Sequence, residues 1–229
     1  MIGGPGPIVG GTDTVYGNGG NDTIVANGTL YGGSGNDSLT GGSGNDTFDG
    51  GAGADTITTN GGDDTIVLNA GAGGAAIADA DIITDFQDGS DVVGMNGLSF
   101  ADFSIAQGTG ANSSHTLLAN ANNGNYLGIL QNISSSNITA ADFMSTSTST
   151  LTFNGTSGNN SFVGGAGNDT FTTGTGTDEA YGHVGDDSFT VNGAGNKTIS
   201  GGSGTDSLNI NYSGIPDITS FASISKDAS

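Results

Sequence analysis

Gly32-Gly33-Ser34-Gly35-Asn36-Asp37-Ser38-Leu39-Thr40 is followed directly by two further nine-residue units, residues 41–49 and 50–58. Each unit has the pattern Gly-Gly-x-Gly-x-Asp-x-apolar-x. We expect the first six residues to form a tight acidic loop and the last three a short strand with one inward apolar side chain. A single unit buries almost nothing, so its stability must come from stacking on its neighbours. A carboxylate at the same place in every loop indicates a hard cation between the stacked turns.

The apolar position of the unit recurs in two arrays along the chain. The first array has Val15, Ile24, Leu30, Leu39, Phe48, Ile57 and Ile66 at this position, and the second has Phe153, Phe162, Phe171, Ala180, Phe189, Ile199 and Leu208. The step is nine residues except for six before Leu30 and ten before Ile199. The six-residue step lacks an acidic residue, which predicts a trimmed loop without a cation. The strand tripeptides are rich in β-branched and aromatic residues, as strands require.

The composition is unfavourable for a protein that folds without help. The 229 residues include 45 Gly, only 33% hydrophobic residues, and 23 acidic against 2 basic side chains, for a net charge of -21. Low hydrophobicity with high net charge is typical of disorder, and glycine raises the entropic cost of folding. We therefore expect the chain to be disordered without its cation and compact with it.

The same composition excludes several classes of partner and site. Nucleic acid is excluded as a partner because its binding requires many Lys and Arg, and the chain has only Lys197 and Lys226. The chain has no Cys, so thiolate metal sites and disulfides are excluded. No apolar run approaches the length of a membrane span. The first seven residues lack the features of a signal peptide, which predicts either export by another route or a piece of a longer polypeptide.

These units resemble the haemolysin-type calcium-binding repeat of RTX proteins. The matching units are residues 32–40, 41–49, 50–58, 164–172 and 201–209, with looser matches at 17–25, 60–67, 174–181 and 182–190. The resemblance implies that two consecutive units make one turn of a right-handed parallel β-roll, with loops alternating between two sides. It also implies several calcium ions between loops two units apart, held by Asp side chains and glycine-rich carbonyls. Such loops suit the larger, flexible coordination shell of calcium better than that of magnesium.

Carried over by position, the resemblance implies ten calcium ligands. They are Asp22, Asp37, Asp46, Asp55, Asp64, Asp81, Asp169, Asp178, Asp187 and Asp206. In the first array the expected pairs are Asp22 with Asp37, Asp37 with Asp55, and Asp46 with Asp64. In the second array they are Asp169 with Asp187 and Asp187 with Asp206. Asp81 is expected to close the last site of the first stack.

The second array departs from the pattern on one side. Asn160 and Asn196 occupy the aspartate place or lie next to it, and Lys197 follows directly. The site at Asp178 is therefore expected to be weak or empty.

We thus predict an all-β chain with two right-handed parallel β-roll arrays separated by a β-rich capping segment. The expected parts are a first array within residues 1–69, a connector and cap over 70–144, a linker at 145–150, a second array over 151–212 and a tail over 213–229. Within the cap, two strand-like runs flank a hairpin turn at 122–125. The expected role of the cap is to cover the open end of the first stack.

Catalysis within this chain is not expected. No His-Glu-x-x-His motif, nucleophile elbow or phosphate-binding loop is present. His115 and His183 lie far apart in sequence and are interpreted as surface residues. The alternative that involves an enzyme is that this chain is the secretion and folding module of a larger extracellular enzyme, whose catalytic domain lies outside this chain.

Two further alternatives concern the outward faces of the strands. Threonine precedes the apolar position at residues 14, 23, 29, 47, 56 and 65, and regular threonine ladders are typical of ice-binding solenoids. The ordinary explanation is the β-propensity of threonine on a solvated face, and the companion outward position is too varied for a flat surface. An adhesive solenoid is the other alternative.

The function that we expect is calcium binding that couples folding to the extracellular medium. The resemblance implies a secreted or cell-surface protein exported by a type I secretion apparatus. The C-terminal export signal typical of the family is not recognisable in residues 220–229, which favours a piece of a longer chain.

Overall fold

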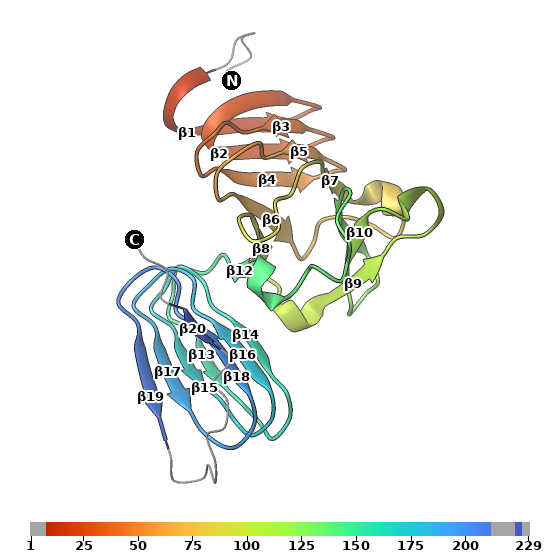
Figure 1. The fold of residues 1–229 in the computed structure, drawn as a ribbon. Helices are drawn as coiled ribbons and strands as arrows, with labels where there is room; N and C mark the ends of the chain where they lie inside the picture. Colours follow the sequence, from red (N-terminus) through yellow and green to blue (C-terminus); the bar gives the residue numbers. More distant parts are fainter. Residues whose placement is uncertain (1–7, 212–222, 226–229) are drawn as a thin grey trace. The chain divides into compact units, whose positions relative to one another are not determined.

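The computed structural model describes residues 8–211 and 223–225, which form a parallel β-solenoid of about 11 turns with little helix (Figure 1). The predicted all-β class is therefore confirmed. The chain divides into two compact units, Met1–Asp142 and Phe143–Ser229. Within the described residues, no helix is long and apolar enough to cross a membrane.

The first unit contains eleven strands and four short 3-10 helices among its described residues. The strands are β1 (Ile8–Gly19), β2 (Thr23–Ser34), β3 (Ser38–Thr40), β4 (Thr47–Ala52), β5 (Thr56–Thr58), β6 (Thr65–Asn69), β7 (Asp81–Ile83), β8 (Val92–Asn96), β9 (Phe103–Gln107), β10 (Thr116–Asn120) and β11 (Tyr126–Leu130). The helices are η1 (Ile77–Asp79), η2 (Phe100–Asp102), η3 (Gly110–Asn112) and η4 (Ala140–Asp142).

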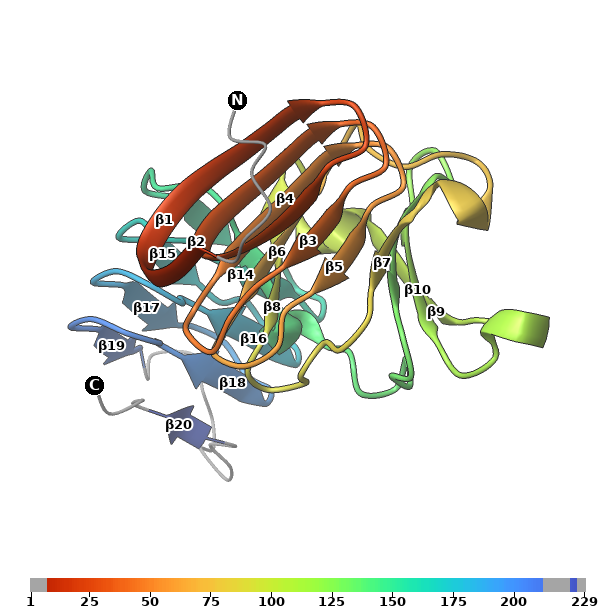
Figure 2. The ribbon, with the colours of Figure 1, turned by 90° about the horizontal axis from the view of Figure 1, so that it is seen from above.

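Strands two steps apart in the chain pair in parallel, which builds two stacks in the first unit. One stack has the order β1-β2-β4-β6-β8 and the other β2-β3-β5-β7-β11. Figure 2 shows these strands side by side as successive rungs. The inward apolar residues are in register along each stack, so that Leu30 pairs with Phe48 and Phe48 with Ile66, all fully buried. The apolar side chains that recur with the nine-residue period therefore fill the space between the two stacks.

The trimmed loop predicted before Leu30 is a continuous strand. β2 runs for 12 residues, and its first part pairs with β3 while its second part pairs with β4. With three residues missing from the loop, the chain crosses between the two stacks without leaving the strand conformation. Gly28, with a φ of 111°, lies at this crossing and approaches the Asp13 backbone too closely for a side chain.

The parallel stacks continue into the segment expected to be a cap. β7 pairs with β5 and β8 pairs with β6, although neither strand belongs to a recognisable repeat. Beyond them β10 lies antiparallel to both β9 and β11, and the predicted turn at 122–125 joins β10 to β11. The solenoid therefore extends past the last repeat motif, and only its far end is antiparallel.

The second unit has the same stacking. Its strands are β12 (Phe143–Ser145), β13 (Thr152–Asn154), β14 (Ser161–Val163), β15 (Thr170–Thr172), β16 (Asp178–Tyr181), β17 (Ser188–Val191), β18 (Lys197–Ser200), β19 (Ser207–Ile210) and β20 (Ser223–Ser225). Two four-stranded parallel sheets have the orders β13-β15-β17-β19 and β14-β16-β18-β20. β20 lies in the segment expected to be a tail, most of which is outside the described residues.

An aromatic column fills the interior of the second unit. The ring of Phe171 stacks on Phe153 at a centroid distance of 4.9 Å and on Phe189 at 4.7 Å, with interplanar angles of 8° and 7°. Phe171 is fully buried. In-register phenylalanines on successive parallel strands therefore take the place of the mixed Leu30, Phe48 and Ile66 column of the first unit.

Candidate metal centres at the aspartate ladders

The aspartates of successive loops on one side of the solenoid are joined by hydrogen bonds. The amide of Asp22 donates to Asp37 Oδ1 at 2.8 Å, and the amide of Asp37 donates to Asp55 Oδ1 at 2.7 Å. Each aspartate carbonyl also accepts a bond from the next rung, as in Ser38 N to Asp22 O at 2.9 Å. Every aspartate is thus held on both sides by the backbone, and its position is set by the stacking of the strands.

The ladder continues to the end of the parallel stacks. The amide of Asp55 donates to Asp81 Oδ1 at 3.0 Å. On the opposite side the amide of Asp46 donates to Asp64 Oδ1 at 2.7 Å, and that of Asp64 donates to Asp91 Oδ1 at 3.1 Å. Asp81 and Asp91 therefore close the two ladders of the first unit.

The second carboxylate oxygen of several ladder aspartates has no partner. The buried Oδ2 atoms of Asp22, Asp37, Asp55, Asp64 and Asp187 accept no hydrogen bond, whereas Asp178 Oδ2 forms an ion pair with Lys197. Burying a carboxylate oxygen without a partner is costly. Such an oxygen is suited to bind a cation.

The first glycine of each unit lines the space beside this oxygen. A Cβ at Gly17 would lie 2.7 Å from Asp22 Oδ2 and 2.5 Å from the Gly32 carbonyl oxygen of the next turn. The same convergence recurs at Gly164, with Asp169 Oδ2 at 2.5 Å and the Gly182 carbonyl oxygen at 2.7 Å, and there Asp169 Oδ2 also accepts a bond from the Gly165 amide at 2.9 Å. A carboxylate oxygen and a carbonyl oxygen from successive turns thus converge where any side chain would collide with them. These are the oxygen donors that calcium prefers.

Burial raises the pKa of five ladder carboxylates, those of Asp55, Asp64, Asp81, Asp91 and Asp187. Burial raises the pKa of Asp64 to about 6, and the nearby carboxylates of Asp91 and Asp46 act in the same direction against a hydrogen bond from the Asp46 amide. Burial likewise raises the pKa of Asp81 to about 7. The pKa rises because burial removes the charged carboxylate from water and so disfavours ionisation. A bound cation would favour the charged form again.

Comparison with known proteins identifies the repeats. The family model of the RTX calcium-binding nonapeptide repeat (4 copies) matches residues 9–29, 26–57, 40–73, 154–189 and 193–209, which together are just over half of the chain. The chain belongs to the RTX calcium-binding nonapeptide repeat family. The predicted resemblance is confirmed, and RTX repeats bind calcium and form a β-roll.

Other comparisons are less informative. A search of curated proteins gave no match. Among solved structures, the RTX chain is similar to the solution structure of the AlgE6R3 subunit from the Azotobacter vinelandii mannuronan C5-epimerase. The TM-score is 0.29 at 22% identity, and the match covers 61% of this chain and 83% of that chain.

The structure places all ten predicted ligands on the ladders. Asp22, Asp37, Asp55 and Asp81 form one series, Asp46 and Asp64 a second, Asp169, Asp187 and Asp206 a third, and Asp178 lies on the fourth. The amide of Asp169 donates to Asp187 Oδ1 at 2.7 Å, and that of Asp187 donates to Asp206 Oδ1 at 3.0 Å. The pairs expected from the RTX spacing are therefore neighbours. Their role as calcium ligands stays a prediction.

Asp178 departs from the predicted arrangement. Its Oδ2 lies 3.1 Å from the Nζ atom of Lys197, and both side chains are buried. The strand register also corrects the sequence alignment, because Lys197 and not Asn196 stands opposite Asp178. The one-residue insertion before Ile199 causes this shift.

Asp91, which closes the second ladder, is not among the ten predicted ligands. Asp91 is buried, and its Oδ2 accepts bonds from the amide of Gln87 at 2.9 Å and the hydroxyl of Thr59 at 3.2 Å. The available signal was the Asp-Val-Val sequence at 91–93, which repeats the Asp-Ile-Ile sequence at 81–83.

A second ladder of asparagines runs beside the aspartates of the RTX repeats and was also missed. The amide of Asn36 donates to Asn21 Oδ1 at 2.9 Å, and the amide of Ala54 donates to Asn36 Oδ1 at 3.2 Å. The signal for this ladder was the residue before the aspartate, which is Asn at positions 21, 36, 45 and 168. This neutral ladder orients the exposed half of each loop while the buried half holds the carboxylates.

The two histidines, expected at the surface, are both half-buried and remain partly exposed. The ring of His115 accepts a bond from the Asn132 amide at 3.1 Å. His183 has a positive φ of 73°, and burial lowers the pKa of its ring. Within the described residues, no three His, Asp or Glu side chains form a cluster that could hold a metal by themselves.

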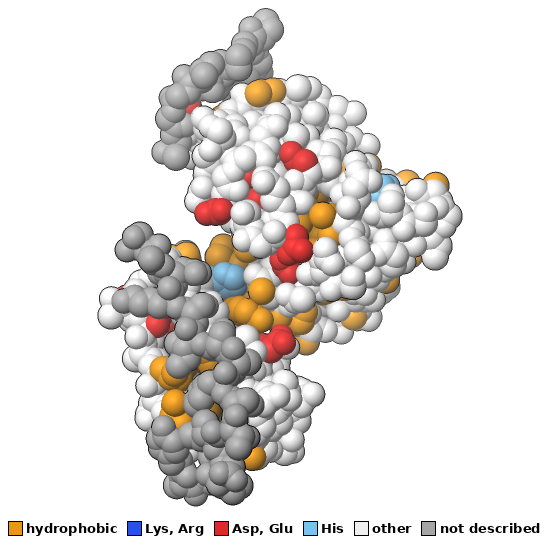
Figure 3. All heavy atoms as spheres, in the orientation of Figure 1, with side chains coloured by type: hydrophobic (Ala, Val, Ile, Leu, Met, Phe, Trp, Pro, Cys, Tyr) orange, Lys and Arg blue, Asp and Glu red, His pale blue; other side chains and the backbone are white. Residues whose placement is uncertain are grey.

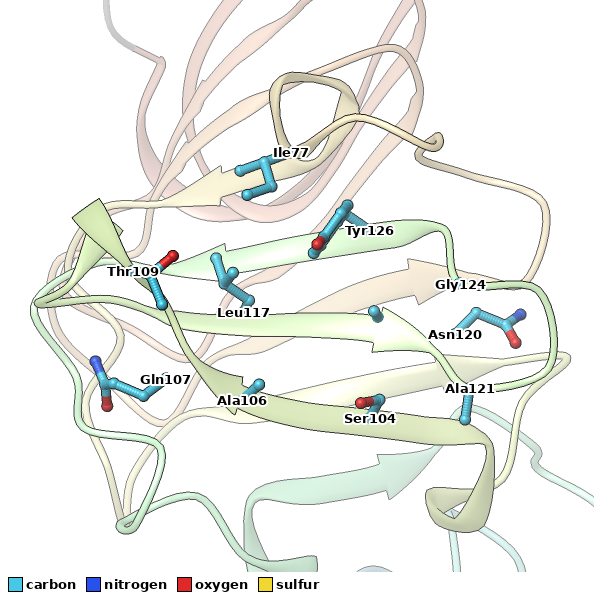
Figure 4. A pocket seen from close by; sticks show the side chains of 11 residues that line it. Ile77, Ser104, Ala106, Gln107, Thr109, Leu117, Asn120, Ala121, Gly124 and Tyr126 are labelled. Atoms are coloured by element: carbon cyan, nitrogen blue, oxygen red, sulfur yellow. The ribbon is translucent and has the colours of Figure 1, made fainter. Parts of the chain in front are cut away.

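A separate pocket of about 430 Å³ lies on the antiparallel end of the first unit (Figure 4). Ile77, Leu117 and Tyr126 supply its apolar side, and Ser104, Gln107 and Asn120 its polar side. Its lining contains no carboxylate, imidazole or amine, so it offers neutral hydrogen-bonding groups only.

Proposed function

We propose that the ladder aspartates bind several calcium ions between successive loops on each side, and that this binding couples folding to extracellular calcium. The observation that carries the proposal is the buried, unpartnered Oδ2 beside the carbonyl of the next turn. At Asp22 these are the Asp22 Oδ2 and Gly32 carbonyl oxygens, both within 2.7 Å of the point that a Cβ at Gly17 would occupy. A cation at that point would satisfy both oxygens and join two turns.

Charge supports the coupling of binding to folding. The chain has 23 Asp and Glu, yet on the face drawn in Figure 3 acidic side chains reach the surface only as small separate patches. Folding without cations buries rows of aspartates against each other. Calcium offsets this repulsion, so its binding free energy becomes folding free energy. Each rung contacts mainly its neighbours, which predicts cooperative filling.

We also propose the finer organisation expected from the sequence. The two arrays would be separate right-handed β-rolls, and the antiparallel strands β9, β10 and β11 would cover one end of the first. The two compact units and the change from parallel to antiparallel pairing support this proposal.

The experiment is a comparison of the full chain in chelator, in millimolar magnesium and in millimolar calcium by circular dichroism. Sites of extracellular calcium modules bind at roughly 10⁻⁴–10⁻³ M. We expect β signal and a thermal transition only in calcium. Equal β signal in chelator would contradict the coupling, and equal signal in magnesium would contradict the selectivity.

Export and location follow as part of the same proposal. A chain that cannot fold at cytosolic calcium stays unfolded for passage through a type I secretion apparatus and folds outside the cell. We propose that it is secreted or displayed at the cell surface, is no enzyme itself, and serves a larger extracellular polypeptide. Expression with such an apparatus should yield the chain in the medium, whereas retention in the cell would contradict this route.

Ice binding is the second candidate because one threonine ladder is in register. Thr14, Thr29, Thr47 and Thr65 are successive partners on β1, β2, β4 and β6. On the other stack the row changes from Thr56 to Ile82. A solvated β-face explains such a ladder equally well, so calcium binding remains our principal proposal. Thermal hysteresis with ice shaping by the calcium-loaded protein would favour ice binding.

A further inference from the structure

Lys197 is a buried cation in the second unit. Its side chain is 3% exposed, and its Nζ donates to the Gly176 carbonyl at 2.7 Å and to the Ala194 carbonyl at 3.3 Å. Asp178 Oδ2 lies 3.1 Å away. We propose that this ammonium is a built-in replacement for a calcium ion, so that the rung between Asp178 and Lys197 needs no calcium.

The donor set around Nζ is the one expected around a calcium ion in this solenoid. It contains one aspartate Oδ2 and loop carbonyls from two successive turns of the same side. The rung at Gly164 has the same two kinds of donor, Asp169 Oδ2 and the Gly182 carbonyl oxygen. The ammonium therefore contacts the same kinds of oxygen, a carboxylate Oδ2 and loop carbonyls, that converge at the Gly164 rung.

The negative charge of Asp178 is already balanced by the positive charge of Lys197. Asn160 stands one rung before Asp178 and donates its amide to Asp178 Oδ1 at 3.0 Å, so it adds no carboxylate. On the opposite side of the unit, Asp169, Asp187 and Asp206 follow one another as three successive carboxylates joined by backbone amides. The two sides of the second unit thus have different cation requirements.

The insertion before Ile199 is what admits the lysine. The ladder bond that an aspartate would accept from the Asp178 amide is made by the Asn196 carbonyl at 2.9 Å. Lys197 stands in the aspartate place without leaving that amide unpaired, and its side chain is free to reach back to Asp178. The Asn196 carbonyl thus replaces the ladder bond that is lost when a lysine stands in the place of an aspartate.

The test counts bound calcium ions by isothermal titration calorimetry for Asp178→Asn, with Asp187→Asn as the matched control. This inference rests on the proposed calcium binding at the other rungs. We expect Asp178→Asn to keep the wild-type number of ions while its melting temperature falls, because a buried lysine loses its partner. Asp187→Asn should lose at least one ion. An ion lost in Asp178→Asn would overturn the replacement, whereas an unchanged number in Asp187→Asn would overturn the calcium sites themselves.

A double variant, Asp178→Asn with Lys197→Met, covers the case in which the single variant does not fold. Removing both charges of a buried pair is tolerated better than removing one. We expect the double variant to bind the wild-type number of ions and to recover most of the lost melting temperature. A lower number, additive losses in melting temperature, or failure to fold in calcium would each contradict the proposal.

Discussion

Replacing Gly41 by alanine should damage one rung, whereas the same change at Gly44 in the same loop should not. A Cβ at Gly41 would lie 2.6 Å from Asp46 Oδ2, 2.6 Å from the Phe48 ring and 2.8 Å from the Thr59 carbonyl oxygen. A Cβ at Gly44 would meet no atom within 4 Å. Overpacking of this kind costs about 1–3 kcal/mol. At 1.4 kcal/mol per factor of ten, the folding equilibrium constant should fall about 5- to 140-fold.

The assay is calcium-dependent folding followed by circular dichroism, with urea unfolding in saturating calcium. Gly41→Ala should raise the calcium concentration at the midpoint and lower the urea midpoint. Gly44→Ala should be neutral or slightly stabilising, by up to about 1 kcal/mol, since alanine restricts the unfolded chain. Equal effects of the two substitutions would refute the assignment of the space beside Gly41 to a cation.

Three other predictions follow from the ladder and the core. Asp37→Ala should raise the calcium midpoint more than Asp13→Ala, because Asp37 is bonded to the rungs before and after it; equal shifts would contradict the register. Phe171→Ala should cost about 3–5 kcal/mol in a urea titration, because the ring is fully buried between two others; a loss below about 1 kcal/mol would show that the aromatic column is loosely packed. In chelator the folded fraction should be larger at pH 5 than at pH 8. Folded Asp64 and Asp81 have pKa values of about 6 and 7, against about 3.9 when unfolded, so their protons favour the folded state until the pH rises through these values. Circular dichroism across this range measures the effect, and a folded fraction that increases with pH would contradict it.

The sequence predicted the repeating part of the fold because the period determines the strand register. Two nine-residue units make a full step of 18 residues, so Phe48 has to stack on Leu30 and Asp55 on Asp37. Stacking gives each inward residue the same environment. The first glycine of each unit has to be glycine, because a side chain there would collide with the neighbouring loop oxygens. These features depend only on spacing, which the sequence displays directly.

The sequence is less informative where the spacing changes. Asp81, which the resemblance places at the end of its ladder, lies 26 residues after Asp55. Asp91, which is not among the ten predicted ligands, lies 27 residues after Asp64, and longer loops are inserted in both places. The parallel stacks still continue, since backbone pairing tolerates a longer loop. At Lys197 a single added residue hid the true register, and only the pairing of the strands shows which side chain stands in the aspartate place.

The central claim is that calcium lies between buried aspartate and carbonyl oxygens of successive loops. A crystal structure of the full chain grown in calcium, with an anomalous difference map, tests it most directly. We expect peaks beside Asp22 Oδ2, Asp37 Oδ2 and Asp187 Oδ2, and no peak at the Nζ atom of Lys197. Aspartate ladders without peaks in saturating calcium would contradict the account.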